Sequence, residues 1–486
     1  MLLLAASYGY HVSPRMSAPP ATDAVTQLCE WVEAQGGSAA KVVAGPTPYG
    51  LGLHATTNLQ RGDVAVSVPS SCLLAAPADD EQALGRLHDS VPDDFWAARL
   101  GLLLLAERAK GESSRVAEYL RTLPATYTVP LMWSPEAVKL LQYPTAQRRL
   151  VKSAKFVSTF STERLLDSAD AMEAFGGLTV GADALGWAVA ASSSRAFALG
   201  GRDRVLCPVI DIGNHAPKGE ASCELRGTRG GAVELVATRD LAAGDEVSYC
   251  YGARLSNDDF LLDYGFVPAS NAHDDVQLAW AAGGLLASAC DVAGIEGQGR
   301  AHGGASADGL ADWQRAALRA ALPAIESVRI RRSGVDDDAM SACRIAVASD
   351  ATALRKCDGG RRALPPAGEA KALRVASAMV AIALSGFPEP TEEEEQQQGQ
   401  EEEESSASGA APLADGGVAL ARQFMAGKRA VCTSSLAALA DRIKAVQSGR
   451  ARAEVRGGAA AKQGAGVRKR SAKRGGAAKK AAAGFG

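Results

Sequence analysis

The sequence predicts an α+β protein: a strand-rich part that contains a helical insertion, followed by an all-α part and a disordered basic tail. Short apolar runs punctuated by glycine occupy residues 42–69 and 205–267, a pattern typical of strands and turns. Apolar stripes at helical spacing occupy residues 79–185 and follow one another again after residue 313. Helix after helix at these lengths indicates a separate all-α domain.

The composition sets wide bounds. A chain of 486 residues exceeds one ordinary domain, so we expect two folded domains plus unstructured segments. The nine cysteines form no CxxC pair and no Cys/His cluster at ligand spacing, so the sequence predicts no metal site and favours a reducing compartment. No apolar run is long enough to span a bilayer, so no membrane partner is expected.

The N-terminal part begins with residues 1–22, which have the composition either of a flexible N-terminus or of a short organelle transit peptide. Apolar residues at helical spacing then predict a helix from Asp23 to Gln35, ended by two glycines. Residues 42–69 predict two strands around a loop at Gly50, a turn at residues 61–63, and a third strand.

The insertion at about residues 79–185 has helical signals of its own. An apolar stripe predicts a core helix from Phe95 to Lys110. Ser134 before Pro135 predicts a helix start, because serine caps helices and proline fits the first turn. We interpret this block as mainly structural.

Polar side chains with catalytic potential gather in residues 205–267. The run Val205–Ile212 predicts a strand that delivers Asp211, Asn214 and His215, with Gly213 allowing a tight backbone. Residues 234–246 predict a strand, a turn and a strand, after which Tyr249 and Tyr251 stand at alternate positions. Side chains two residues apart on a strand share a face, so both phenols should point the same way.

These residues resemble a known family. The order of Asp211, Asn214, His215, Tyr251 and residues 263–266 resembles the C-terminal motifs of SET-domain protein lysine methyltransferases, above all the Rubisco large-subunit lysine methyltransferase subfamily. Further likenesses are Gly50-Leu51-Gly52-Leu53 to the GxGL motif, Ser194-Arg195-Ala196-Phe197 to a Ser-Arg-x-Phe motif, and residues 423–439 to the last helices of that subfamily's substrate-binding domain.

The resemblance implies a domain division. Residues 23–268 would form the SET domain and residues 269–447 a helical substrate-binding domain. Residues 392–406, with eight glutamates, should be a solvated loop. Residues 448–486 carry eleven Lys or Arg against one Glu, so this disordered tail is either a nucleic-acid-binding or nuclear-targeting segment or simply a solvated basic tail.

The resemblance also implies an activity, S-adenosyl-L-methionine-dependent protein-lysine N-methylation. Tyr251 would be catalytic, and the substrate lysine would contact Asp211, Tyr251 and Tyr264, with Tyr264 helping to set how many methyl groups fit. The cofactor would be held by residues from four stretches of the chain: Gly50, Leu51, Gly52, Ser194, Arg195, Asn214, His215 and Tyr264.

Alternatives remain open at this point. Members of the same subfamily also methylate protein histidines, and a SET domain can serve as a binding module without catalysis. The chain lacks the flanking cysteine clusters of many histone methyltransferases, so a non-histone protein is the expected substrate. The expected compartment is the cytoplasm or the chloroplast, or the nucleus if the basic tail is a targeting signal.

Overall fold

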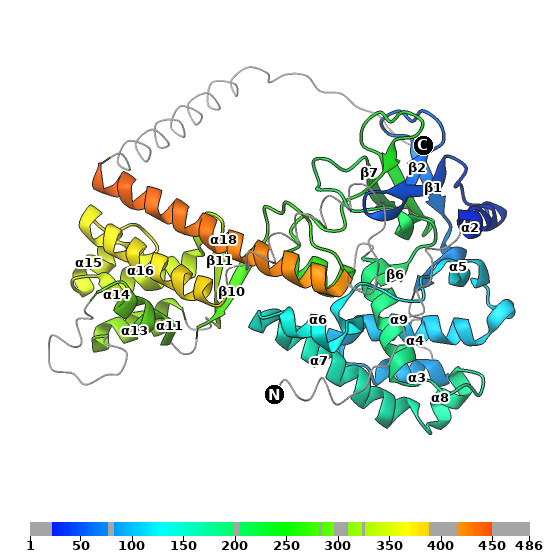
Figure 1. Cartoon of the computed structure of the whole chain (residues 1–486), viewed down its shortest axis with the longest axis horizontal. Coiled ribbons are helices and arrows are strands. Elements are labelled where there is room, and N and C mark those ends of the chain that lie inside the picture. Colours follow the sequence, from blue (N-terminus) through cyan, green and yellow to red (C-terminus); the bar gives the residue numbers. More distant parts are fainter. Residues whose placement is uncertain are drawn as a thin grey trace, which may run out of the picture. The chain divides into compact units, whose positions relative to one another are not determined.

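A computed structural model describes residues 22–75, 82–198, 204–280, 284–295, 310–322, 326–387 and 416–449 (Figure 1). The predictions for residues 1–21, for the acidic loop at 392–406 and for the basic tail from residue 450 lie outside the described residues. The chain divides into two compact units, residues 1–274 with 386–428, and residues 275–385 with 429–486.

The first unit contains three small antiparallel sheets of three strands each. They have the strand orders β1-β2-β9, β3-β8-β7 and β4-β6-β5. The strands predicted within residues 42–69 are present as β1, β2 and β3. The bounds are β1 Val42–Thr47, β2 Gly50–Ala55, β3 Val64–Val68, β4 Leu74–Ala75, β5 Ala196–Ala198, β6 Arg204–Leu206, β7 Cys223–Gly227, β8 Val233–Ala237 and β9 Glu246–Val247.

The strand predicted at Val205–Ile212 is wrong in its second half. Strand β6 ends at Leu206, and Ile210–Ile212 forms a 3₁₀ turn. Proline has no N–H to donate to a sheet, and Val209 adopts a φ of 68°, which no strand tolerates. The chain therefore turns sharply after Pro208, and the turn brings Asp211 into the interior, where its side chain is fully buried.

Helices surround these sheets in the first unit. Their bounds are α2 Thr22–Ala34, α3 Ala83–Asp89, α4 Trp96–Ala109, α5 Ala117–Thr122, α6 Pro135–Leu140, α7 Pro144–Phe160, α8 Ala169–Ala174, α9 Ala182–Arg195 and α10 Asn257–Asp259, which continues as a π-helical turn over Phe260–Tyr264. Helix α6 begins as predicted, with the Ala137 N–H donating to Ser134 Oγ at 3.3 Å. Helix α4 packs closely on α9, since a Cβ on Gly101 would lie 3.1 Å from the Ala188 backbone.

The second unit is mainly helical, as predicted, and it also contains a small antiparallel sheet of β10 Asp275–Ala279, β11 Ser327–Arg331 and β12 Gly334–Val335. Its helices are α11 Gly284–Val292, α13 Asp312–Ala321, α14 Asp337–Val347, α15 Ala351–Lys356 and α16 Pro366–Ser385. The buried Arg344 on α14 pairs with the buried Glu369 on α16 at 2.7 Å, so a charge-assisted interaction joins two helices of this core.

Helix α18, Gly416–Gln447, corrects another expectation. The sequence predicts separate helices at residues 418–425 and 432–446, but the structure has one continuous helix. Gly427 is the only weak helix former in the presumed break, and one glycine costs a helix about 1 kcal/mol without ending it. The helix belongs to the first unit as far as Lys428 and to the second unit beyond it.

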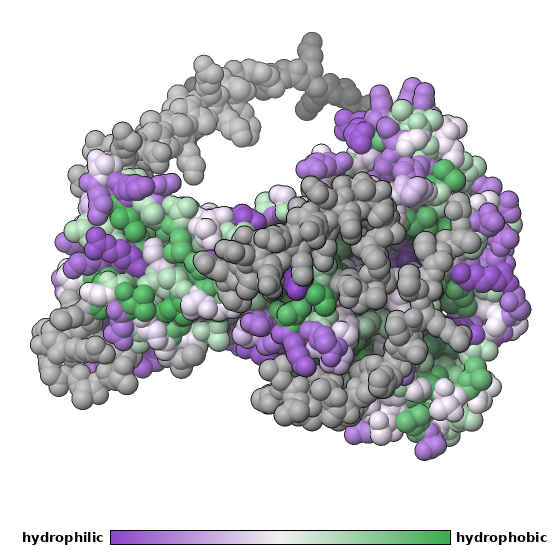
Figure 2. Space-filling model, viewed as in Figure 1, coloured by the Kyte–Doolittle hydropathy of each residue, from purple (hydrophilic) through white to green (hydrophobic). Residues whose placement is uncertain are grey.

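The visible surface mixes hydrophilic and apolar residues. On the face seen in Figure 2, hydrophilic residues surround small apolar areas. All nine cysteines have free thiols, and no helix among the described residues is both long and apolar enough to cross a membrane.

Candidate active site

The site is built around the hydroxyl of Tyr251. This hydroxyl donates to the Gly213 carbonyl oxygen at 2.9 Å, and the Tyr251 N–H donates to His215 Nδ1 at 3.2 Å. The rings of Tyr249 and Tyr264 each lie 5.0 Å from the Tyr251 ring. The two phenols predicted to share a face do lie together, and Tyr264 joins them from the next helix.

Burial keeps these phenols protonated. It raises the pKa of Tyr264 to about 12, and it also raises the pKa of Tyr251. At neutral pH, Tyr251 is therefore a neutral hydrogen-bonding group and no base.

Two distant segments meet to hold these residues. The Tyr249 N–H donates to the Asn214 carbonyl at 3.1 Å, and the Ala216 N–H donates to the Tyr249 carbonyl at 3.0 Å. The tyrosine-bearing segment is also bonded to strand β7, because the Cys223 N–H donates to the Ser248 carbonyl at 2.8 Å. Backbone hydrogen bonds thus fix Asn214 and His215 against the tyrosine-bearing segment.

His215 is a neutral imidazole in an aromatic cluster. Its ring centroid lies 4.7 Å from Phe260, 5.2 Å from Tyr251 and 6.0 Å from Phe266. Burial lowers its pKa to about 4. Because Nδ1 accepts from the Tyr251 N–H, the single proton of the neutral ring is on Nε2, which remains a donor.

The glycine motif lies against Asn214. The Asn214 side-chain amide donates to Thr47 Oγ1 at 3.0 Å and to Glu246 Oε1 at 2.9 Å. A Cβ on Gly52 would lie 2.6 Å from that amide nitrogen, so only glycine fits this strand position. Gly50 differs: its φ is 100° and the space beside it is open.

The partly buried Arg195 forms an ion pair with the fully buried side chain of Asp211. Arg195 Nη1 lies 3.2 Å from Asp211 Oδ2, which also accepts the Tyr119 hydroxyl at 2.8 Å. Burial raises the pKa of the Asp211 carboxyl, and the neighbouring Arg195 opposes this shift. This fully buried carboxylate lies between two internal partners and positions Arg195, and its contact with a substrate stays a prediction.

Ser194 is likewise directed inward to its own helix, because its hydroxyl donates to the Ala190 carbonyl at 2.7 Å. Sequence reasoning missed Tyr119, Thr47 and Glu246 as partners of the site. They lie 92, 167 and 32 residues from the side chains they bind, and no local pattern marks them. Among the described residues, no group of three or more His, Cys, Asp or Glu side chains could hold a metal ion.

Two family models match this chain. The SET domain model matches residues 50–252, and the Rubisco LSMT substrate-binding model matches residues 305–431. The chain contains a SET domain and a Rubisco LSMT substrate-binding domain. The SET match begins at Gly50 and ends one residue after Tyr251, so Tyr264 lies beyond it.

Curated relatives match about half of the chain. Human SET domain-containing protein 4 is 29% identical over 241 residues, covering 46% of this chain and 53% of that protein. An actin-histidine N-methyltransferase of Danio rerio is 29% identical over 249 residues, covering 47% and 39%. The chloroplastic fructose-bisphosphate aldolase-lysine N-methyltransferase of Arabidopsis thaliana is 28% identical over 261 residues, covering 51% and 52%. The chain thus spans about half the length of these relatives, or less.

A solved structure extends the likeness to both domains. The structure of Rubisco LSMT bound to AdoMet matches with a TM-score of 0.62 at 20% identity, covering 87% of this chain and 93% of that chain. At this identity the match shows a shared fold for the SET domain together with the substrate-binding domain.

Proposed function

We propose that this chain is an S-adenosylmethionine-dependent protein-lysine N-methyltransferase that acts on a non-histone protein. The observation that carries the proposal is the Tyr251 hydroxyl, which is held at 2.9 Å by the Gly213 carbonyl directly beside Asn214 and His215. Relatives named for methylating aldolase and actin support a non-histone protein substrate.

The residues present fit S-adenosylmethionine. Open space beside Gly50 leaves the main chain at this residue accessible to a ligand. Arg195 supplies a cation, and its buried Nε has no hydrogen-bond partner in the described part of the chain. A guanidinium with a free donor suits the carboxylate of the cofactor's methionine part. His215 Nε2 and Asn214 would complete the cofactor site, with Tyr264 closing it beside Tyr251. When bound, the cofactor supplies the methyl group as a sulfonium.

The chain's own residues would prepare the acceptor nitrogen. The Tyr251 hydroxyl donates its hydrogen bond to the Gly213 carbonyl. The lone pairs of its oxygen therefore point away from that bond and can accept an N–H of the incoming amine. The rings of Tyr249, Tyr264 and Phe266 surround Tyr251 and would limit the water around a bound amine. Desolvation lowers the pKa of a lysine ammonium, which favours the neutral, nucleophilic amine.

Histidine is the second candidate target, since the actin-histidine N-methyltransferase is 29% identical to this chain over 249 residues and the aldolase-lysine enzyme is 28% identical over 261 residues. A histidine side chain would need no deprotonation at neutral pH, because an imidazole is already largely neutral there. We propose the cytoplasm or the chloroplast as the compartment, and the chloroplastic relative from Arabidopsis thaliana supports the second. A nucleic acid or another acidic partner for the basic tail remains a proposal from composition.

The test is methyl transfer from labelled S-adenosylmethionine to proteins of the source lysate. We expect the purified chain to label a discrete band on a lysine, and Tyr251→Phe to reduce the rate about 10²–10³-fold, as loss of one oriented transition-state hydroxyl does. Calorimetry with S-adenosylhomocysteine is the control, and both proteins should bind it within twofold.

Mapping the modified residue decides between the targets. Label on a histidine would replace the lysine proposal with the second candidate. Binding of the cofactor product with no transfer to any protein, in freshly prepared lysate or in lysate from cells depleted of S-adenosylmethionine, would instead favour a non-catalytic binding module.

A further inference from the structure

One helical segment, Asn257–Tyr264, brings Tyr264 to the site, and both of its ends are fixed. At the start, Ser256 and Asp259 form a capping box, with the Asp259 N–H donating to Ser256 Oγ at 3.3 Å and the Ser256 N–H donating to Asp259 Oδ2 at 3.0 Å. At the end, Gly265 has a φ of 78°, and a Cβ there would lie 2.5 Å from Thr128 Oγ1. The segment therefore starts and stops at defined places.

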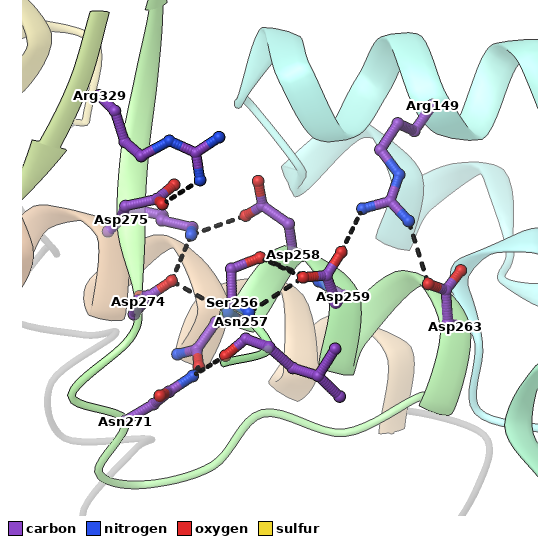
Figure 3. A network of polar contacts seen from close by, with 12 residues as sticks. Arg149, Ser256, Asn257, Asp258, Asp259, Asp263, Asn271, Asp274, Asp275 and Arg329 are labelled. Carbon is purple, nitrogen blue, oxygen red and sulfur yellow. Dashed lines mark hydrogen bonds and ion pairs between the residues drawn. The ribbon is translucent and has the colours of Figure 1, made fainter. Parts of the chain in front are cut away.

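Arg149, on helix α7 of the insertion, holds one side of this segment. Its guanidinium donates to Asp259 Oδ1 at 3.0 Å and to Asp263 Oδ2 at 3.1 Å (Figure 3). Residues four apart on a helix share a face, so a single guanidinium can bridge both carboxylates. Asp263 immediately precedes Tyr264.

Lys428, on helix α18, holds the other side. Its ammonium is fully buried, 2.6 Å from Asp258 Oδ1 and 2.6 Å from Asp274 Oδ1. Asp274 Oδ1 also accepts the Asn257 N–H at 3.0 Å, which ties the ammonium to the first residue of the segment. A buried cation is tolerated only with close anionic partners, so these two carboxylates are what keep Lys428 in place.

The segment forms a wall of the site. The Tyr264 ring lies 5.0 Å from the Tyr251 ring, and Phe260 lies 4.7 Å from the His215 ring. We propose that Arg149 and Lys428 are positioning residues that clamp this segment and thereby set the space beside the Tyr251 hydroxyl. That space must hold the acceptor nitrogen with any methyl groups it already carries, so the inference rests on the proposed methyltransferase function.

Arg149→Met is the test variant, because the Arg149 side chain is 41% exposed and exposed ion pairs contribute little to global stability. Lys152→Met is the matched control: it removes an exposed ion pair, to Asp94 at 2.7 Å, from the same helix. Hydrogen–deuterium exchange measures the clamp itself. We expect exchange across residues 257–265 to rise about tenfold in Arg149→Met and to stay unchanged in Lys152→Met, because a segment opens more often once the interactions that hold it are removed.

The second readout is the methylation state of the protein band labelled by the wild type. A looser wall leaves more room, so Arg149→Met should raise the ratio of higher to lower methylation states at least about threefold, an energy difference comparable to that of one weak hydrogen bond. Asp263→Asn should act in the same direction. The double variant with Arg149→Met should add little, since both substitutions remove the same ion pair.

Either of two results overturns the inference. Unchanged exchange in Arg149→Met would show that the clamp does not hold the segment. Raised exchange with an unchanged ratio of methylation states would show a structural role without influence on the site. If the wild type methylates nothing, the proposed function fails, and the exchange result alone then decides whether Arg149 holds the segment.

Discussion

Replacement of Gly52 by alanine should damage the site from its centre. The new Cβ would lie 2.6 Å from Asn214 Nδ2 and 2.6 Å from Thr47 Cγ2, whereas ordinary van der Waals distances begin near 3.4 Å. Relief requires the Asn214 amide to move by most of an ångström, which breaks its hydrogen bonds to Thr47 at 3.0 Å and to Glu246 at 2.9 Å. Overpacking together with the two broken hydrogen bonds should cost about 2–4 kcal/mol of unfolding free energy.

The Gly52→Ala substitution should weaken ligand binding in addition to stability. The Asn214 carbonyl accepts the Tyr249 N–H at 3.1 Å, so displacement of Asn214 disturbs the segment that carries Tyr251. We expect S-adenosylhomocysteine to bind at least about tenfold more weakly, corresponding to the loss of roughly one hydrogen bond.

Gly227→Ala is the matched control, because Gly227 ends strand β7 and a Cβ there meets nothing within 4 Å. Denaturant unfolding and calorimetry on both variants and the wild type measure the two effects. The reasoning is refuted if Gly52→Ala unfolds and binds like Gly227→Ala.

Two further predictions concern other parts of the molecule. Burial lowers the pKa of His215 from an ordinary 6.5 to about 4 in the folded state, so between these pH values only the unfolded chain takes up the proton. The contribution of neutral His215 to stability is therefore fully present above pH 6.5 and is lost as the pH falls toward 4. The non-titrating variant His215→Gln should flatten the pH dependence of urea unfolding within this window, and an unchanged slope would contradict the assignment. In the second unit, Arg344→Met leaves the buried Glu369 carboxylate without its cationic partner, so we expect the free energy of unfolding to fall by about 3–5 kcal/mol. The affinity for S-adenosylhomocysteine should stay unchanged. Weakened binding would mean that the site depends on the core of that unit.

Local patterns identified much of the secondary structure. Ser134 and Pro135 predicted the start of α6, and the apolar stripe from Phe95 predicted α4, because capping and helical periodicity depend only on near neighbours. The same reasoning failed at Val209, whose positive φ follows from the turn it must make inside the protein. It also failed between residues 425 and 432, where helix α18 runs through Gly427, and it missed strands β11 and β12.

The candidate site divides in the same way. Asn214, His215 and Tyr251 were recognised from their order in the sequence, and the structure brings them together through backbone hydrogen bonds and the Tyr251 hydroxyl. The side chains that hold them were not recognised. Tyr119 and Thr47 are ordinary residues in sequence, and only folding places them beside Asp211 and Asn214.

The amino-acid sequence was thus enough to predict an α+β chain with a SET domain, a substrate-binding domain after it, and the groups that would carry the chemistry. Residue type and spacing along the chain are sufficient for this, since motifs and periodicity are local properties. The burial, protonation and ion pairing of those groups depend on the tertiary structure. Asp211 is paired inside the protein, His215 is neutral, and Arg149 and Lys428 meet the segment that ends at Tyr264, because burial, pKa and ion pairing depend on neighbours that the chain supplies from far away.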